Sequence, residues 1–346
     1  MTAAIVDETA VQHNTWDAQR AKFISESDAR QAIPVVAPQR LKKLGALCVF
    51  DLAKREFPKR EPLLAPWLNT QDLSMVFAER GIGKTHFSVA VAFAVATGGR
   101  FLDWQARVPS KVLYLDGELP GEVMQQRLAM HAPDTDPEPG YLRVFTPGLL
   151  SDDELMPDLA TIDGQHAVEA MIEPDTRLVI IDNLSAWARS GGRENDAESW
   201  LCIADWLMAL RRRGIAVLLV HHGGKNGDQR GTSKREDLLD ASIKLARPAD
   251  YDPKEGAKFV LSFSKSRHLT GDDVRSLEIT LNDINGRAKW AWTTTEDSTL
   301  DRVVALSKEG LKPGEICAEL DINKSTVSRH LRRARELGLI EAGAEK

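Results

Sequence analysis

The chain has 346 residues, of which 42% are hydrophobic and 28% charged, so it can build two or three domains with cores of their own. Lys and Arg total 45 against 51 Asp and Glu, a net charge of -6 that excludes a uniformly basic coat but allows local basic patches. The longest fully apolar run, residues 89–96, is too short to span a membrane, and the N-terminus lacks a secretory pattern. The three cysteines are each more than 100 residues from the next, which predicts no disulfide framework and a cytoplasmic location.

Residues 1–50 are polar and weakly patterned. They are read either as an N-terminal arm that reaches a neighbouring subunit or as a partly disordered tail. A stretch rich in proline and charge, residues 57–62, follows and marks the entry to the main domain. We expect three parts: an arm over 1–50, a main domain over 51–295 and a small C-terminal domain over 296–346.

The middle of the chain predicts an α/β fold. Nearly continuous apolar runs indicate strands at 73–78, 111–116, 177–182 and 215–221, with helices at 84–97 and 197–213. Strands of this kind are covered on both faces, which is typical of a parallel sheet. After residue 240 the runs alternate, and they predict antiparallel edge strands at 241–247, 258–267, 276–281 and 289–293. Residues 294–298 are expected to form a linker.

A phosphate-binding loop follows the first of these strands. Residues 78–85, AERGIGKT, fit the pattern G-x-x-x-x-G-K-[ST], except that Ala78 replaces the first glycine. Backbone N–H groups of such a loop surround the phosphates, the lysine reaches the β- and γ-phosphates, and the following helix presents its positive end. The alternative is a chance glycine-rich turn with a surface lysine. The predicted nucleotide-binding residues are Glu79, Arg80, Gly81, Ile82, Gly83, Lys84, Thr85 and His86.

Acidic residues end two of the predicted strands. Asp182 closes the run LVIID and is predicted to hold Mg²⁺ together with Thr85, although many buried strands also end in Asp. Asp116 and Glu118 follow the strand at 111–116. We take Glu118 as the general base that polarises the attacking water, since it lies just past the strand; the alternative is an acidic helix cap.

His221 and His222 end the strand at 215–221. Neighbouring residues of a strand point to opposite faces, so the two histidines cannot share one metal ion without distortion. A polar side chain at this strand end is a candidate sensor of the γ-phosphate. The loop that follows, residues 223–235, is rich in glycine and carries Lys225 and Arg230, which suit either a nucleic-acid contact or an ordinary solvated loop.

The order of the phosphate loop, YLDGE, LVIIDN, LLVHHGGK and RGTS resembles the RecA-like ATPases, and within them the RepA-type hexameric helicase group related to DnaB-like and KaiC-like proteins. The resemblance covers about residues 60–290. It implies a RecA-like sheet, ATP and Mg²⁺ as ligands, and a homo-hexameric ring around single-stranded DNA. It also implies that Lys84 and Thr85 bind nucleotide and metal, that Glu118 activates water, and that His222 or His221 is the sensor, with His222 preferred. By the same resemblance, Lys265 and Arg267 enter the neighbouring subunit's site.

The C-terminal segment is similar to a helix-turn-helix. Helices are predicted at 300–308, 313–320 and 325–337. Residues 324–335 contain five basic side chains and no acid, which suits the major groove of duplex DNA. The alternative is a basic face that binds protein or RNA. The predicted DNA-binding residues are Lys324, Ser325, Thr326, Arg329, Arg332 and Arg333, besides Lys225 and Arg230 of the glycine-rich loop.

Taken together, the sequence predicts a Mg²⁺-dependent ATPase that acts on DNA. The first hypothesis is a ring-forming helicase or translocase without membrane attachment. The alternatives are a DNA-bound regulator in which ATP controls assembly without unwinding, and an ATPase of recombination or repair.

Overall fold

The computed structural model describes residues 45–133, 136–190, 197–223, 234–248, 251–252 and 256–340. The chain divides into two compact units, Met1–Phe57 and Pro58–Lys346. In the first unit the described part contains one short helix, α2 (Val49–Lys54), which has no buried side chain. Among the residues that the structure describes, no helix is long and apolar enough to cross a membrane.

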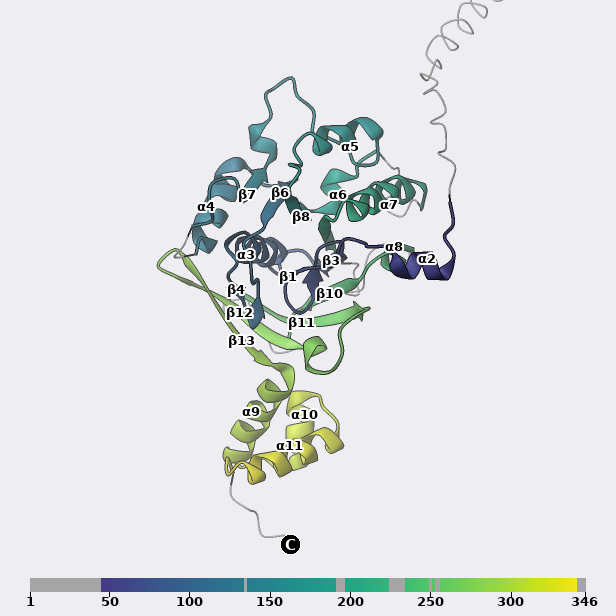
Figure 1. Cartoon of the computed structure of the whole chain (residues 1–346). Coiled ribbons are helices and arrows are strands. Elements are labelled where there is room, and N and C mark those ends of the chain that lie inside the picture. The colour runs from purple at the N-terminus through teal and green to yellow at the C-terminus, as the bar shows by residue number, and fades with distance from the viewer. Residues whose placement is uncertain are drawn as a thin grey trace, which may run out of the picture. The chain divides into compact units, whose positions relative to one another are not determined.

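The second unit is built on a nine-stranded sheet with the order β13-β12-β11-β10-β3-β9-β8-β6-β7 (Figure 1). The six strands from β10 to β7 are parallel, and β11, β12 and β13 pair antiparallel. The strands are β3 (Leu73–Ala78), β6 (Lys111–Asp116), β7 (Leu142–Phe145), β8 (Thr176–Asp182), β9 (Ala216–His222), β10 (Ala241–Ala246), β11 (Ala257–Ser266), β12 (Leu277–Ile284) and β13 (Arg287–Thr294). The predicted mostly parallel sheet with antiparallel strands toward one edge is therefore confirmed. The strand predicted at 241–247 as an antiparallel edge strand is wrong in direction and place: it is β10, which lies inside the sheet, parallel to β3 and antiparallel to β11. An alternating run indicates which side chains share a face of the sheet, not the direction in which the strand pairs.

Alternate residues of the central strands enter two separate cores. In β8, Leu178 and Ile180 pack into one core, whereas Val179 and Ile181 pack into the other. The first core includes α3 (Lys84–Thr97) and α4 (Gly121–His131), and the second includes α5 (Ile162–Glu169), α6 (Leu184–Trp187) and α7 (Ala197–Arg212). Since both faces are covered, strands with continuous apolar runs stabilise this sheet.

Two small hairpins extend the first core. They are β1–β2 (Pro62–Leu64 and Leu68–Asn69) and β4–β5 (Arg100–Phe101 and Trp104–Gln105). Trp67 and Trp104 contribute a ring pair with centroids 5.3 Å apart, and Phe87 of α3 packs edge-on against Trp104. These aromatic contacts hold the helix that follows the phosphate loop against the sheet.

The predicted linker at 294–298 is wrong. Helix α9 (Thr295–Lys308) begins directly after β13, because Thr294 Oγ1 accepts a hydrogen bond from the Asp297 N–H at 3.0 Å and so caps the helix. Glu278 of β12 then accepts hydrogen bonds from Ser298 Oγ at 2.7 Å and from Arg302 Nη2 at 2.8 Å. The C-terminal domain is therefore joined to the sheet by side-chain contacts as well as by the chain.

The C-terminal domain contains α9, α10 (Pro313–Leu320) and α11 (Lys324–Glu336). Val303, Ile316, Val327 and Leu331 form its small buried core. Asp321 adopts a positive φ of 51° between α10 and α11, and Asn323 Oδ1 accepts from the Thr326 N–H at 2.9 Å to begin α11. This is the tight turn of a helix-turn-helix.

Candidate nucleotide site and nucleic-acid interface

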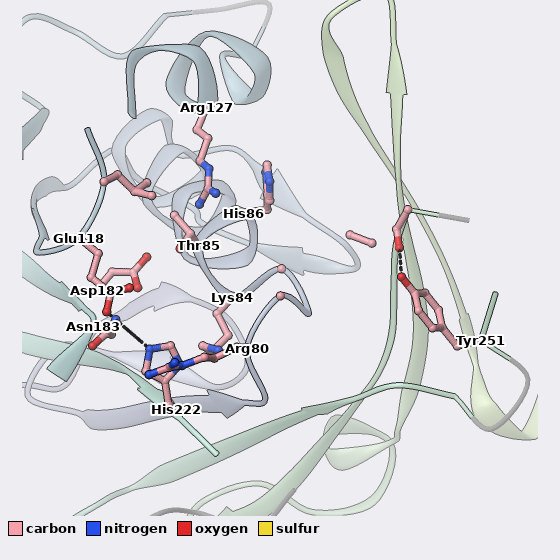
Figure 2. Close-up of a pocket in the computed structure, with 15 residues that line it drawn as sticks. Arg80, Lys84, Thr85, His86, Glu118, Arg127, Asp182, Asn183, His222 and Tyr251 are labelled. Carbon is pink, nitrogen blue, oxygen red and sulfur yellow. Dashed lines mark hydrogen bonds and ion pairs between the residues drawn. The ribbon is translucent and has the colours of Figure 1, made fainter. Parts of the chain in front are cut away.

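A cavity of about 720 Å³ opens where the carboxyl ends of four parallel strands meet. The strand register places Ala78 of β3 beside His222 of β9, and Asp116 of β6 beside Asp182 of β8. Most of the residues predicted for the nucleotide and its metal therefore line one cavity: Arg80, Gly81, Gly83, Lys84, Thr85, His86, Glu118, Asp182 and His222 (Figure 2). Of the other two predicted loop residues, Ile82 is buried in the first core and Glu79 is exposed.

The phosphate loop is shaped by two glycines in the left-handed region. Gly81 has a φ of 77° and Gly83 a φ of 116°, values that a residue with a Cβ rarely adopts. Lys84 Nζ donates to the carbonyl oxygens of Ala78 at 3.0 Å and Glu79 at 2.8 Å, which places the ammonium inside the loop. Burial lowers the pKa of Lys84, as expected for a cation taken out of water. An anion in the loop would reverse that effect.

Asp182 is a buried carboxylate that lines the cavity. Its Oδ2 accepts from Tyr114 Oη at 2.7 Å and from Ser88 Oγ at 3.4 Å. Burial raises the pKa of this carboxyl, while the hydrogen bonds from Tyr114 and Thr85 lower it. A carboxylate beside a hydroxyl is the hard oxygen donor set that Mg²⁺ prefers. Thr85 and Asp182 thus fit the metal, which would supply charge neutralisation at the phosphate oxygens.

The two acids after β6 have different surroundings. Asp116 is buried and accepts from the N–H groups of Glu118 and Leu119 at 3.2–3.3 Å and from Thr146 Oγ1 at 2.9 Å. Asp116 therefore shapes the turn, and burial raises its pKa. The side chain of Glu118 is 53% exposed, lines the cavity, and has its Oε1 3.7 Å from His222 Nε2. Of these two acids, Glu118 alone lines the cavity.

Gly117, between these two acids, is required by close packing and not by its backbone conformation. A Cβ at this position would lie 2.7 Å from the Cβ of Ala186 and 2.9 Å from Nε1 of Trp187. Its φ is not positive. The glycine of YLDGE thus lets the turn pack against α6, and through α6 against the strand end that carries Asp182.

The two histidines of β9 separate as the strand geometry requires. His221 is 1% exposed and lies away from the cavity lining, whereas His222 lines the cavity. His222 Nε2 lies 3.2 Å from Asn183 Nδ2, and Asn183 Oδ1 accepts from the Ala186 N–H at 3.1 Å to begin α6. Burial lowers the pKa of His222, with Lys84 and Arg80 adding to that effect, so the ring is neutral near pH 7.

Six cavity residues were not predicted: Leu119, Arg127, Asn183, Tyr251, Gly256 and Ala257. Asn183 directly follows Asp182, and its position at a strand end was a signal that could have been used. Arg127 comes from α4 and Tyr251 from the segment before β11. Neither has a local sequence signal, because only the packing of α4 and of the antiparallel strands brings them to the cavity.

Lys265 and Arg267 do not line the cavity of their own subunit. Both donate to main-chain carbonyls of α8 (Lys234–Asp237), Lys265 to Glu236 and Arg267 to Asp237. Arg267 also lies 3.8 Å from Asp240, a buried carboxylate that is paired with Arg211 at 3.1 Å. They thus reach the same element, as two side chains two positions apart on an extended chain should.

The basic helix α11 presents most of its predicted residues to solvent. Lys324, Ser325, Arg329 and Arg332 are exposed and Thr326 is half-buried. Arg333 is turned toward α9 instead, where it pairs with Asp297 at 3.2 Å and Glu296 at 3.6 Å. Lys225 and Arg230, the predicted residues of the glycine-rich loop, lie outside the described residues.

The sequence model of a family described as "AAA domain" matches residues 37–228, more than half of the chain. A second, described as "Bacterial regulatory protein, arsR family", matches residues 303–342. No curated protein matches the chain.

Solved structures with a similar fold were found. A KaiC-like protein from Pyrococcus horikoshii OT3 has 11% identity and a TM-score of 0.48, over 66% of this chain and 93% of that one. A DnaB-like replicative helicase has 14% identity and a TM-score of 0.47, over 63% of this chain and 58% of that one. The RadB recombinase has 16% identity and a TM-score of 0.41, over 61% and 88%.

The sheet order, the phosphate loop after β3 and the acids after β6 and β8 define a RecA-like P-loop ATPase fold, with a helix-turn-helix at the C-terminus. More particularly, the chain belongs to the AAA domain family.

Proposed function

We propose that this protein is a Mg²⁺-dependent ATPase that acts on DNA, and that it works as a ring-forming helicase or translocase of the RepA type. The observation that supports ATP hydrolysis best is the single cavity that joins Lys84, Thr85, Asp182, Glu118 and His222. The part concerning DNA rests on α11 and on the resemblance of the motif order to hexameric helicases.

Each residue has a definite task in the proposed reaction. Glu118 takes a proton from a water molecule, whose oxygen forms a bond to the γ-phosphorus while the bond to the β–γ bridging oxygen breaks. Lys84 and the loop N–H groups stabilise the negative charge that develops on the phosphate oxygens. His222, neutral and held by Asn183, donates or accepts one hydrogen bond near the γ-phosphate. Glu118 Oε1 lies 3.7 Å from His222 Nε2. A change in the hydrogen bonding of His222 when the phosphate leaves would therefore act directly on the general base.

The ring part of the proposal concerns Lys265 and Arg267. Their resemblance to the pair that enters a neighbouring site suggests that they complete the active site in trans. In their own subunit they bind α8, which begins within the last residues of the glycine-rich loop. In a ring, Lys265 and Arg267 of one subunit would lie between the nucleotide of the neighbouring subunit and the glycine-rich loop of their own subunit. Arg267→Ala should then fold normally and bind ATP. It should hydrolyse ATP about 10³-fold more slowly, because the neighbouring site loses its arginine.

A second candidate function is a DNA-bound regulator in which ATP controls assembly without unwinding. The contacts of Glu278 with Ser298 and Arg302 favour it, because they tie the helix-turn-helix to the sheet that carries the nucleotide site. A helix-turn-helix that is tied to the ATPase sheet suits binding at a fixed duplex site.

The deciding experiment combines three measurements on the full chain. ATP hydrolysis is measured for wild type and for Lys84→Ala, which should be inactive but folded. Strand displacement on a forked duplex and gel shifts on random duplex are then run with and without ATP, alongside the mass in solution. Displacement by an ATP-dependent ring supports the helicase. Tight duplex binding without displacement supports the regulator, and full hydrolysis by well-folded Lys84→Ala contradicts the proposed site.

A further inference from the structure

Tyr114 is a buried side chain of β6 for which the proposed reaction gives no task. It is fully buried in the first core, between the sheet and α3. Its hydroxyl donates to Asp182 Oδ2 at 2.7 Å. A phenylalanine would fill the same space in this core, and a hydroxyl buried without a partner would cost free energy. The hydroxyl is therefore explained by its bond to Asp182 and not by packing.

Ser88 connects Tyr114 to the helix that follows the phosphate loop. Ser88 lies on α3 and is also fully buried. Its Oγ lies 2.8 Å from Tyr114 Oη and 3.4 Å from Asp182 Oδ2. The same oxygen lies 3.1 Å from the main-chain oxygen of Thr85, three residues earlier in α3. Thr85 and Asp182, the two proposed metal ligands, are thus joined through two buried hydroxyl groups.

The hydrogens of the two hydroxyl groups decide how this network is ordered. A carboxylate only accepts hydrogen bonds, and each hydroxyl has one hydrogen to donate. Tyr114 gives its hydrogen to Asp182, so its oxygen is left to accept from Ser88. Both hydroxyl groups meet Oδ2 of Asp182, and neither occupies Oδ1. The network therefore holds the carboxylate through one oxygen only, which leaves the other for a metal ion or its bound water.

The two proposed metal ligands come from elements that are far apart in the chain. Thr85 lies in the first turn of α3, and Asp182 ends β8, the strand next to β6. A shift of α3 relative to β8 would change their separation, and Mg²⁺ requires nearly octahedral ligands at about 2.1 Å. We propose that Tyr114 and Ser88 are positioning residues, which hold Asp182 at the separation from Thr85 that Mg²⁺ requires.

This proposal rests on the proposed Mg²⁺-dependent ATPase function, and titration with MgCl₂ tests it separately. The dissociation constant of a non-hydrolysable ATP analogue is measured on the full chain, first in EDTA and then at increasing Mg²⁺. Tyr114→Phe keeps the ring in the core and removes the hydroxyl. The Mg²⁺ concentration that gives half of the gain in affinity should rise by about 10–100-fold, the usual loss when a partner of a metal ligand is removed. The dissociation constant in EDTA should stay that of wild type.

Hydrolysis gives a second measurement that a merely structural defect would not reproduce. At saturating ATP, Tyr114→Phe should hydrolyse slowly at low Mg²⁺ and reach the wild-type kcat when Mg²⁺ is raised, because only the affinity for the metal is reduced. A general loosening of the cavity would instead lower kcat at every Mg²⁺ concentration.

Tyr141→Phe is the matched control, because Tyr141 packs against the same core and does not line the cavity. It removes the same atom, and its Mg²⁺ dependence should equal that of wild type. A wild-type Mg²⁺ dependence in folded Tyr114→Phe would overturn the proposal. So would weaker binding of the analogue in EDTA, since the hydroxyl would then support the whole cavity. A wild-type protein that binds no nucleotide, or binds it without regard to Mg²⁺, would contradict the proposed function instead.

Ser88→Ala tests the other hydroxyl and decides the question should Tyr114→Phe not fold. It should raise the required Mg²⁺ concentration by a smaller factor, because Tyr114 still donates to Asp182. The double variant should need little more Mg²⁺ than Tyr114→Phe alone, since both hydroxyl groups act on one oxygen. A wild-type Mg²⁺ dependence in Ser88→Ala, or two factors that simply multiply, would overturn the connected network.

Discussion

At the scale of single residues, the two carboxylates after β6 illustrate how burial divides their tasks. Asp116 is fully engaged by N–H and hydroxyl donors of the turn, and Glu118 faces the cavity. A group whose lone pairs are all in use cannot also accept a proton from water without breaking the turn. The difference between Asp116 and Glu118 depends on three donors to Asp116. Two are backbone N–H groups of the turn, and the third is the hydroxyl of Thr146, from a separate part of the chain.

Glu118→Gln should still bind ATP but hydrolyse it at least about 10²-fold more slowly, because the amide keeps the shape and cannot take a proton. Single-turnover hydrolysis and analogue binding check this. Asp116→Asn is the comparison: it should lower the free energy of unfolding by about 1–3 kcal/mol through the lost acceptor in the turn. If Glu118→Gln retains full turnover, Glu118 is not the general base.

The histidine pair beside the cavity predicts a pH dependence of stability. His86 and His131 have pKa values of about 4 and about 3 when folded, below the usual value of 6.5. The unfolded chain therefore binds protons below pH 6.5 that the folded chain does not, so stability is full above 6.5 and falls as the pH drops toward 4. Each histidine should remove about 1–2 kcal/mol between pH 7 and pH 5.

Urea unfolding of wild type and His131→Gln at pH 7 and pH 5 measures this effect. The glutamine does not titrate and can still hydrogen-bond His86, so the loss of stability between the two pH values should be smaller by the contribution of one histidine. An equal loss in both proteins would mean that His131 is readily protonated in the folded state.

At the scale of elements, α11 carries its charges in two directions. Arg329 and Arg332 face solvent, and Arg333 is paired with Asp297 and Glu296 of α9. The i,i+4 pair of Arg332 with Glu336, at 4.0 Å and largely exposed, adds little stability. One helix thus provides both a proposed DNA surface and a contact within its own domain.

Arg332→Ala should weaken binding to all duplex sequences and reduce the slope of log K against log salt by about one unit. Arg333→Ala is the neighbouring control and should leave that slope nearly unchanged, since its charge is already neutralised by α9. Salt titrations of duplex affinity distinguish the two. Equal changes in slope would show that Arg333 leaves α9 to contact DNA.

At the scale of the whole molecule, the helix-turn-helix and the ATPase sheet meet at Glu278. This carboxylate lies within reach of Lys258 of β11 at 3.6 Å as well as Arg302 and Ser298 of α9. Ala257, the preceding residue of β11, lines the nucleotide cavity. The two parts are therefore connected by a short run of neighbouring residues, and both the helicase and the regulator would use the same joint.

Deletion of residues 296–346 should leave ATP hydrolysis near its wild-type rate and strongly weaken duplex binding. The cavity residues all lie before residue 260, whereas the exposed basic helix is lost entirely. Hydrolysis assays and gel shifts on the same preparation check both effects. An unchanged gel shift after the deletion would identify the C-terminal domain as a protein-binding module.

Much of the architecture follows from local pattern. The continuous apolar runs predicted β3, β6, β8 and β9, the alternating runs predicted β11 to β13, and the glycine spacing predicted the phosphate loop. The alternating run of β10 predicted a strand but not its parallel pairing with β3. The error at 294–298 has a local cause as well: a polar run reads as a linker, but Thr294 and Asp297 form a helix cap. Capping and linker residues have the same composition, so only the helix that follows distinguishes them.

The sequence by itself determined the fold class and the chemistry of the loop, because a strand, a glycine turn and a helix N-terminus are set by neighbours a few residues apart. Only the tertiary structure decided which side chains meet. The parallel register brings Asp182 beside Asp116 and His222 beside Ala78, and the packing of α4 brings Arg127 to the cavity. It likewise paired Arg333 with Asp297 of α9 and joined Glu278 to Arg302. Such contacts join residues far apart in the chain, and their strength depends on burial and distance, which no single stretch of sequence contains.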